Sequence, residues 1–255
     1  MTTLAGKTAI ITGAGAGIGR ATALHMTAAG ARVAVTDVDD AGGNETVEQI
    51  TASGGDAVFL HHDVTSETEW VDVVAKTEST FGGIDILFNN AGIYIIAPVT
   101  DIELDTWNKL MAVNVTGTFL GMKHTIPSLI ARGGGSIVNA SSVAGLRGIA
   151  GHTLYGASKG AVRIMSKDVA AEYAAANIRV NSIHPTYTKT AMASYGARIA
   201  GATLDELGRK VAPLGRLADV DDVAKVVVFL ASDDAAYLTG GEYLIDGGGM
   251  NIFNV

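Results

Sequence analysis

Residues 8–20 read TAIITGAGAGIGR, an apolar run followed directly by a glycine-rich turn and the start of a helical pattern. Glycine lets the backbone turn sharply and approach a ligand closely, and a helix N-terminus offers N–H groups to a phosphate. The strand–turn–helix order therefore predicts a turn that cradles a pyrophosphate. The spacing is Gly13, three residues, Gly17, one residue and Gly19, so the strict G-x-G-x-x-G pattern is not met. The turn does not end in G-K-[ST], which disfavours a Walker-type nucleotide hydrolase.

The same alternation of strand and helix continues along the chain. Short β-branched runs, apolar on both faces, are typical of buried parallel strands. The expected strands are 8–12, 32–36, 57–61, 84–88, 136–140, 179–183 and 242–245. The expected helices are 17–30, 41–53, 67–81, 103–132, 153–176 and 220–231. This pattern predicts an α/β fold, a Rossmann-type doubly wound parallel sheet of about seven strands with helices on both faces.

We expect one domain over residues 1–255, because strands recur until Ile245 and leave no room for a second unit. One segment, from Thr190 to Pro213, breaks the rhythm and is rich in Ala and Gly. An insertion there can act as a substrate lid. A surface helix pair is an equally good interpretation of the same segment.

Composition excludes several classes of function. Hydrophobic residues make up 48% of the chain, and the net charge of −8 leaves no footprint for nucleic acid. The chain has no cysteine, its N-terminus lacks the pattern of a secretion signal, and no apolar run is long enough to span a membrane. We therefore expect a cytoplasmic protein. The six histidines show no metal-ligand spacing, so no catalytic metal is expected.

Asp37 stands at the end of the second expected strand, 18 residues after Gly19. A carboxylate at this point accepts hydrogen bonds from the adenosine ribose and repels a 2′-phosphate. Ala16 and Val38 supply no basic partner for such a phosphate, so the sequence favours NAD over NADP. Asp63 and Val64 follow the third strand and are candidates for the adenine edge, although an Asx turn is nearly as good an explanation.

Tyr155 and Lys159 are spaced i and i+4, which places both side chains on one helix face. An ammonium beside a phenol favours the phenolate, so we expect Lys159 to lower the pKa of Tyr155 towards the working range of a general base. Alone, this spacing is usually a solvated pair. The pair Ser141-Ser142 ends the fifth strand, at the sheet edge where α/β folds bind ligands, and this context favours the catalytic interpretation.

Residues 156–160 also match G-x-S-x-G, the nucleophile elbow of hydrolases. That motif needs a strand before the serine and a helix after it. Residues 148–154 are predicted as a loop, and the residues after Ser158 continue a helix. A chance match is the preferred interpretation.

With these residues in place, the chain resembles the compact branch of the short-chain dehydrogenase/reductase family over residues 4–249. The motifs that carry the resemblance are spread along the chain in family order. They are residues 12–19, Asp37, Asp63-Val64, Asn89-Asn90-Ala91-Gly92, Asn114, Ser141-Ser142, Tyr155-Gly-Ala-Ser-Lys159, Pro185 and Asp246-Gly247-Gly248.

The resemblance implies a catalytic set and a cofactor site. The catalytic set is Asn114, Ser142, Tyr155 and Lys159, with Asn114 bending its helix and holding a water in a proton relay. The expected cofactor contacts are Gly13, Ala16, Gly17, Ile18, Gly19, Asp37, Asp63, Val64, Asn90, Ala91, Gly92, Tyr155, Lys159, Pro185, Thr188 and Thr190. The family usually has Gly after Pro185, and this chain has Thr186, a departure that leaves open the backbone path beside the nicotinamide and the roles of Thr188 and Thr190 there.

The implied function is NAD-dependent interconversion of a secondary alcohol and its ketone. By family position the substrate contacts are Tyr94, Ala144, His152 and Tyr187, a largely apolar set that favours an uncharged, cyclic or aromatic substrate. A homotetramer is implied as well. The alternatives are a 3-oxoacyl carrier-protein reductase that prefers NADPH and a catalytically silent NAD-binding protein.

Overall fold

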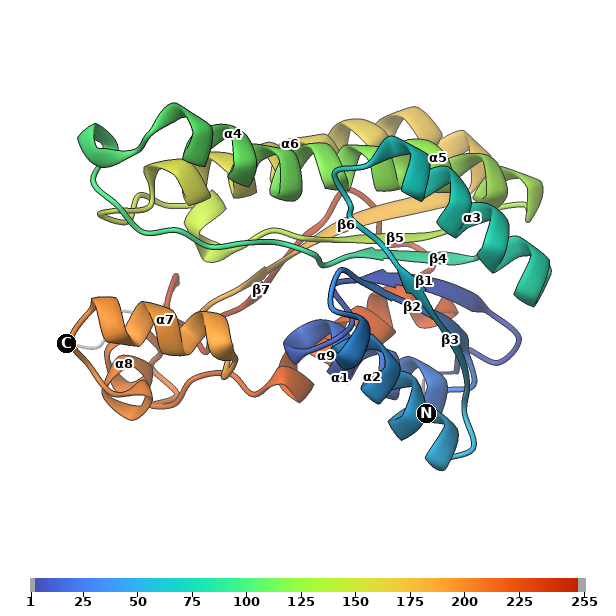
Figure 1. The fold of residues 1–255 in the computed structure, drawn as a ribbon, viewed down its shortest axis with the longest axis horizontal. Helices are drawn as coiled ribbons and strands as arrows, with labels where there is room; N and C mark the ends of the chain where they lie inside the picture. The colour runs from blue at the N-terminus through green and yellow to red at the C-terminus, as the bar shows by residue number, and fades with distance from the viewer. Residues whose placement is uncertain (1–2, 252–255) are drawn as a thin grey trace.

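The computed structural model describes residues 3–251 and is built around one sheet of seven parallel strands (Figure 1). The strand order is β3-β2-β1-β4-β5-β6-β7. From β1 the chain builds the sheet outwards to β3 on one side, and from β4 onwards it builds the other side, so the switch point lies between β1 and β4. The strands are β1 (Thr8–Thr12), β2 (Arg32–Asp37), β3 (Asp56–His61), β4 (Ile86–Asn89), β5 (Gly135–Ala140), β6 (Ile178–Pro185) and β7 (Glu242–Ile245). The predicted fold class is confirmed, and strand ends differ from the predicted ones by at most two residues.

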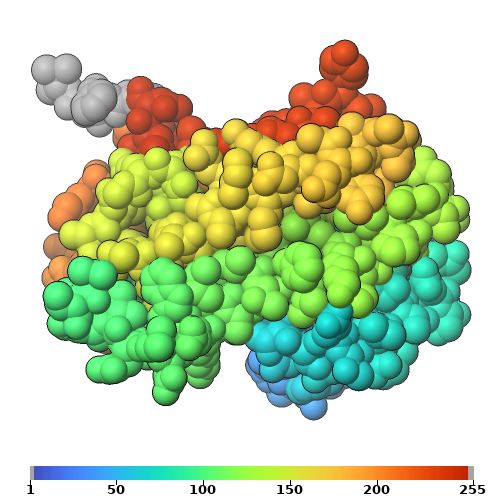
Figure 2. Space-filling view, turned by 90° about the horizontal axis from the view of Figure 1, so that it is seen from above, coloured from blue at the N-terminus to red at the C-terminus, as the bar shows by residue number. Residues whose placement is uncertain are grey.

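Helices cover both faces of the sheet (Figure 1). One face carries α1 (Gly17–Ala28), α2 (Asp40–Ala52) and α9 (Val220–Ala231). The other face carries α3 (Glu67–Phe81), α4 (Leu104–Met111), α5 (Gly117–Ala131) and α6 (Thr153–Tyr173). Figure 2 shows this second layer from outside, with the green to yellow segments of α4, α5 and α6 lying together across the face. The two layers bury the strands on both sides, which explains why the central strands are apolar throughout.

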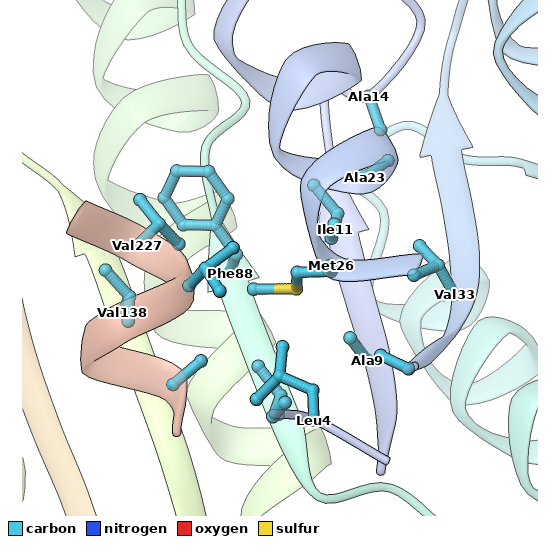
Figure 3. Close-up of a cluster of buried hydrophobic side chains, with 14 of the residues drawn as sticks. Leu4, Ala9, Ile11, Ala14, Ala23, Met26, Val33, Phe88, Val138 and Val227 are labelled. Atoms are coloured by element: carbon cyan, nitrogen blue, oxygen red, sulfur yellow. The ribbon is translucent and has the colours of Figure 1, made fainter. Parts of the chain in front are cut away.

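The two sides of the sheet have separate apolar cores. Between β1 and the α1/α9 layer, Met26 and Val227 pack against Ile11 and Phe88 (Figure 3). On the opposite side, the fully buried Trp70 of α3 packs with its neighbours against the same strands. Burying large side chains of this kind contributes about 1.5–3 kcal/mol each before entropic costs. These cores hold the carboxyl ends of β1, β4 and β5 in a fixed arrangement.

The predicted helix 103–132 is interrupted. It comprises α4, a π-helical turn over Ala112–Thr116, and α5. A π turn adds a residue to a helical turn and is often found at functional sites. Asn114 lies at the centre of this one and is fully buried.

The segment from Thr190 to Pro213 forms the helix pair α7 (Ala191–Ile199) and α8 (Leu204–Val211), at the carboxyl end of the sheet (Figure 1). Ala193, Ala197, Leu207 and Leu217 give this pair a small core of its own. Within residues 3–251, no helix is both long and apolar enough to cross a membrane. The same residues contain no cluster of three or more metal-ligating side chains.

Candidate active site

The glycine turn is packed so tightly that side chains are excluded. A Cβ on Gly19 would lie 2.2 Å from the Gly13 carbonyl oxygen, and Gly13 itself has a φ of +62°. The N-cap of α1, Ala16, has no side chain that caps the first N–H groups of the helix. These N–H groups are therefore available to an anion, as predicted for a pyrophosphate cradle.

The loop after β4 is joined to this turn by hydrogen bonds. The Asn90 side chain donates to the carbonyls of Thr12 (2.9 Å) and Gly13 (3.1 Å). The Thr12 hydroxyl accepts from the backbone N–H groups of Asn90 and Ala91, both at 3.0 Å. The predicted contacts Asn90, Ala91 and Gly92 thus lie next to the glycine turn, where β1 and β4 diverge.

Asp37 ends β2 and points at the glycine turn. One carboxylate oxygen accepts from the Gly15 N–H at 2.8 Å, and the other accepts from the Asp39 N–H at 3.0 Å. A Cβ on Gly15 would lie 2.9 Å from this carboxylate, so the contact requires glycine there. The structure places Asp37 beside the turn, as its spacing predicted.

Arg20 was missed by sequence reasoning, which found no basic side chain near the turn. Its guanidinium donates to the Gly15 carbonyl and forms an ion pair with Glu45 at 2.8 Å. The same group donates to Thr46 at 3.0 Å. Arg20 therefore joins α1 to α2, and its charge is already partnered by a carboxylate. The available signal was that Arg20 lies in the first turn of the helix that follows the glycine turn.

Asp63 forms the Asx turn that was the alternative to an adenine contact. Its carboxylate accepts from the backbone N–H of Thr65 at 2.9 Å and from the Thr65 hydroxyl at 2.8 Å. Val64 is buried, and its carbonyl accepts from the Trp70 indole at 3.0 Å. A role for either residue at the adenine stays a prediction.

Tyr155 and Lys159 lie on one face of α6, and both are buried. The Lys159 ammonium lies 5.7 Å from the centre of the Tyr155 ring and donates to the Ala140 carbonyl at 2.7 Å. Burial raises the pKa of Tyr155 to about 12, and burial lowers the pKa of Lys159 to about 8. Desolvation of the phenolate therefore outweighs the lowering that was expected from the neighbouring Lys159.

Ser142 faces Tyr155 from the end of β5. Its hydroxyl is hydrogen-bonded to Tyr155 and lowers the pKa of that phenol, against the larger effect of burial. The same oxygen accepts from the Ala144 N–H at 3.2 Å, which fixes its position. Ser141 points away and donates to the Lys159 carbonyl at 2.8 Å, which is a structural role.

Asn114 does not line the cavity, and its side chain joins the π turn to the loop after β4 and to α6. Its side-chain amide exchanges two hydrogen bonds with the backbone of Ile93, at 2.8 and 3.0 Å. It also donates to the Ser158 hydroxyl at 3.1 Å. Ser158 is fully buried and donates to the Tyr155 carbonyl at 2.7 Å. The G-x-S-x-G match therefore lies inside α6 without a preceding strand, and its serine is an inaccessible structural residue.

One cavity at the carboxyl edge of the sheet brings the main groups together. Of the predicted residues, its lining includes Ile18, Asn90, Gly92, Tyr94, Ser142, Ala144, His152, Tyr155, Lys159, Pro185, Tyr187, Thr188 and Thr190. Asn114, Gly13, Ala16, Gly19, Asp37, Asp63, Val64 and Ala91 do not line it, and Gly17 lines a neighbouring hollow. Ile149 lines the cavity and was not predicted. Its position in a loop before the catalytic helix offered no periodic signal.

Thr186, where the family usually has Gly, continues the backbone from β6 along the cavity wall. Its φ lies outside the left-handed region that would require glycine, and its N–H donates to the Ile245 carbonyl at 3.1 Å. The Thr188 hydroxyl donates to the Thr186 carbonyl at 3.2 Å, and the Thr190 hydroxyl donates to the Thr188 carbonyl at 3.0 Å. The threonines therefore form an ordered turn on the cavity wall.

Comparisons with known proteins agree with this geometry. A family model described as enoyl-(acyl carrier protein) reductase matches residues 13–250. The chain is 41% identical to 2,5-dichloro-2,5-cyclohexadiene-1,4-diol dehydrogenase of Sphingobium indicum, covering 96% of both chains. It is 39% identical to cyclohexanol dehydrogenase of an Acinetobacter species, covering 94% of both. A solved 7α-hydroxysteroid dehydrogenase, complexed with NADH and a 7-oxo bile acid, is 33% identical with a TM-score of 0.90, over 99% of this chain and 97% of that one. The chain belongs to the short-chain dehydrogenase/reductase family.

Proposed function

We propose that this protein is an NAD-dependent oxidoreductase that interconverts an uncharged cyclic secondary alcohol and its ketone. One observation carries the proposal: Ser142, Tyr155 and Lys159 line the same cavity as Ile18 of the glycine turn and Thr188 and Thr190 of the opposite wall. A nicotinamide held at the glycine turn would thereby share one cavity at the sheet edge with a general base.

The chain's own residues fit a dinucleotide. The uncapped N-terminus of α1 and the glycines that exclude a Cβ suit a pyrophosphate. Asp37 is held in place by two backbone N–H groups and presents a carboxylate that suits two ribose hydroxyls but repels a 2′-phosphate. Because Arg20 is paired with Glu45, the charge of this guanidinium is already partnered and does not offset that repulsion. These contacts support NAD over NADP.

In the proposed mechanism Tyr155 accepts the proton of the substrate hydroxyl when the alcohol is oxidised. When bound, NAD⁺ would supply the hydride acceptor and a positive charge, and that charge would lower the pKa of Tyr155 from its buried value. Ser142 donates to the substrate oxygen and holds it against the Tyr155 hydroxyl. Lys159 places a second positive charge on the same side, anchored through the Ala140 carbonyl. General-base catalysis of this kind contributes about 10²–10⁴-fold to the rate.

Asn114 lies on the side of Tyr155 and Lys159 away from the cavity, where it can support proton transfer to the exterior. It connects Ile93 to Ser158, which in turn contacts the Tyr155 carbonyl. A Cβ on Gly92 would lie 3.2 Å from the Asn114 amide oxygen and 3.4 Å from the Lys159 ammonium. Both side chains therefore lie close to Gly92, and we propose that a water bound between them passes the proton between Lys159 and the exterior.

Two features support the substrate class. Lys159 is the single Lys or Arg among the residues that line the cavity, and aromatic and aliphatic side chains form much of the remaining wall. Relatives include dehydrogenases named for cyclohexanol and for a cyclohexadienediol. An uncharged ring fits this wall better than a carboxylate or a phosphopantetheine arm.

We further propose that residues 1–255 act as a single domain and that α7 and α8 serve as a lid. Thr190, Met192 and Ala193 at the start of α7 line the cavity, so movement of this pair changes access to it. For assembly we propose a homotetramer in the cytoplasm. Phe119, Ile130 and Ile164 on α5 and α6 are each about half exposed (48%, 49% and 54%), which supports contacts between subunits.

The test is NAD⁺ reduction by the purified protein, followed at 340 nm across cyclic, aromatic and aliphatic secondary alcohols, with NADP⁺ in parallel. We expect turnover with cyclic alcohols and NAD⁺. Acetoacetyl and crotonyl thioesters with NADPH test the carrier-protein reductase that the matched family description suggests. Preference for NADPH and thioesters would replace the proposal, and tight NADH binding without any turnover would support a silent binding protein.

A further inference from the structure

A chain of three side chains forms the cavity wall on the side of Tyr94. The Tyr94 hydroxyl contacts His152 Nε2 at 2.6 Å and the Tyr187 hydroxyl at 3.0 Å. The Tyr94 ring stands edge-on to the Tyr155 ring, with centroids 4.6 Å apart. All three residues line the cavity that holds Ser142 and Tyr155. This wall is therefore polar, although the reaction step proposed above uses none of its groups.

The direction of each hydrogen bond follows from His152. Its Nδ1 lies 2.9 Å from the Ala150 carbonyl oxygen, which only accepts, so Nδ1 carries the proton. In a neutral imidazole Nε2 is then an acceptor, and the Tyr94 hydroxyl donates to it. Burial raises the pKa of Tyr94, which keeps that proton in place. Because Tyr94 has no second proton, Tyr187 donates to Tyr94.

As a result, the hydroxyl proton of Tyr187 is engaged in the hydrogen bond to Tyr94. The Tyr187 oxygen keeps lone pairs that can accept a hydrogen bond but has no proton left to give. A wall with this polarity binds a group that donates, such as a hydroxyl, and offers nothing to an ether or ketone oxygen. A buried site built to pair with a hydroxyl discriminates against analogues that lack the donor.

We propose that Tyr187, oriented by Tyr94 and His152, forms a subsite for a second hydroxyl of the substrate, so that the preferred substrates are cyclic diols or hydroxyketones. This inference rests on the proposed function, because the first oxygen is the one held by Ser142 and Tyr155. It adds that a second oxygen on the ring, remote from the reacting carbon, must be a hydrogen-bond donor.

The surrounding residues hold this wall in place. A Cβ on Gly196 would lie 2.7 Å from the Tyr187 ring, so α7 covers that ring only because glycine is present there. The Tyr195 ring packs edge-on against Tyr94, with centroids 5.9 Å apart. His152 is 8% exposed, so water has little access to compete for its bond. A rigid and partly desolvated acceptor is selective, because a bound group without a proton to donate would leave the Tyr187 oxygen unpaired.

The experiment compares three matched substrates with NAD⁺: cyclohexanol, cyclohexane-1,4-diol and 4-methoxycyclohexanol. Wild type should show a kcat/KM for the diol about tenfold above that for the other two, after a factor of two for its equivalent hydroxyls. Tyr187→Phe removes the acceptor and should reduce this preference to about the statistical factor. Tyr195→Phe removes a hydroxyl from the same aromatic group, outside the hydrogen-bond chain, and should keep the wild-type ratio.

A second variant tests the direction of the chain. His152→Leu frees the proton of Tyr94, which can then donate to Tyr187 and leave the Tyr187 proton free. The preference should move from the diol towards 4-methoxycyclohexanol, whereas simple damage to the wall would lower the rate for all three substrates together. An unchanged diol preference in both Tyr187→Phe and His152→Leu would overturn the subsite.

Binding measurements separate the subsite from the reaction. In the Tyr155→Phe background with NAD⁺, calorimetric titration with the three compounds reports affinity without turnover, and the same tenfold preference should disappear on adding Tyr187→Phe. Oxidation of cyclohexanol together with equal affinities for all three would remove the subsite and leave the proposed function. If no alcohol reduces NAD⁺ but the diol still binds more tightly in a way that depends on Tyr187, the subsite would stand and the proposed function would fall.

Discussion

Lys159 follows Tyr155 by one turn of α6, yet its ammonium donates to the Ala140 carbonyl at 2.7 Å and stands 5.7 Å from the centre of the Tyr155 ring. The lysine is thereby tied to the end of β5 and acts on the phenol through space. Burial opposes charge on both groups. It raises the pKa of Tyr155 to about 12 and lowers the pKa of Lys159 to about 8. A base in this cavity therefore needs the additional positive charge that an oxidised nicotinamide brings.

Tyr155→Phe should lower kcat for alcohol oxidation by at least about 100-fold, because the variant keeps the ring and loses the group that takes the proton. The affinity for NADH should change by less than a few-fold, since the glycine turn and Asp37 are untouched. Fluorescence titration with NADH and steady-state kinetics measure the two effects. Substantial residual turnover would remove Tyr155 from the role of base.

Ser142→Ala should move the pH profile of alcohol oxidation to higher pH. Oxidation requires the phenolate, so its rate rises with pH through the pKa of Tyr155. The hydrogen bond from Ser142 lowers that pKa, and its removal raises it. A shift of roughly one pH unit corresponds to about 1.4 kcal/mol. The kcat/KM profile between pH 6 and 10 checks this, with Ser141→Ala as the matched variant. A profile that drops in height without moving would contradict the assignment.

Cofactor choice should depend on Asp37 and Glu45 together. Asp37→Asn keeps an acceptor for the Gly15 N–H and removes the charge that repels a 2′-phosphate, so NADPH should bind about tenfold more tightly. Adding Glu45→Gln frees the Arg20 guanidinium and should improve NADPH binding further. Glu45→Gln alone is the control and should leave NADH preferred. Dissociation constants for both cofactors decide it, and an unchanged ratio in the double variant would exclude Asp37 as the discriminator.

Lys159→Met should abolish turnover and change how stability depends on pH. The pKa of Lys159 is lowered in the folded protein to about 8, below its unfolded value, so the unfolded state binds more protons between these two values. In that window the wild-type free energy of unfolding should rise relative to the variant by roughly 1.4 kcal/mol per pH unit at most. Below pH 8 the difference should be constant. Urea titrations of both proteins from pH 7 to 10 measure it, and parallel curves throughout would contradict the buried pKa.

The sequence predicted the sheet well because both of its faces are buried. Strands such as β1, in which every residue is buried, have to be apolar throughout, and this leaves an unambiguous signal. The positions of the glycine turn, Asp37, Ser142 and the Tyr155–Lys159 pair followed from their places at strand ends and on one helix. Their roles in catalysis and cofactor binding remain predictions that the experiments above test.

The remaining features depend on contacts between distant segments. The pKa of Tyr155 is governed by how deeply α6 is buried, and spacing along a helix does not report burial. The partnership of Arg20 with Glu45 joins α1 to α2, and the bond between Tyr94 and Tyr187 spans 93 residues. The bend of the helix at Asn114 was implied by the family resemblance alone, because one additional residue in a helical turn leaves the apolar periodicity nearly unchanged.

The helix pair α7–α8 is closed at its base. Thr188 pairs with Ala218, the Lys189 N–H donates to the Ala218 carbonyl at 2.9 Å, and the pair has its own apolar core. The chain thus leaves β6 and comes back beside it at Ala218, so the length and sequence of residues 191–217 can vary without moving the strands. Exchange of these residues between relatives, with Thr188 and Thr190 kept, is therefore a route to new substrate preference in which the hydride-transfer apparatus keeps its geometry.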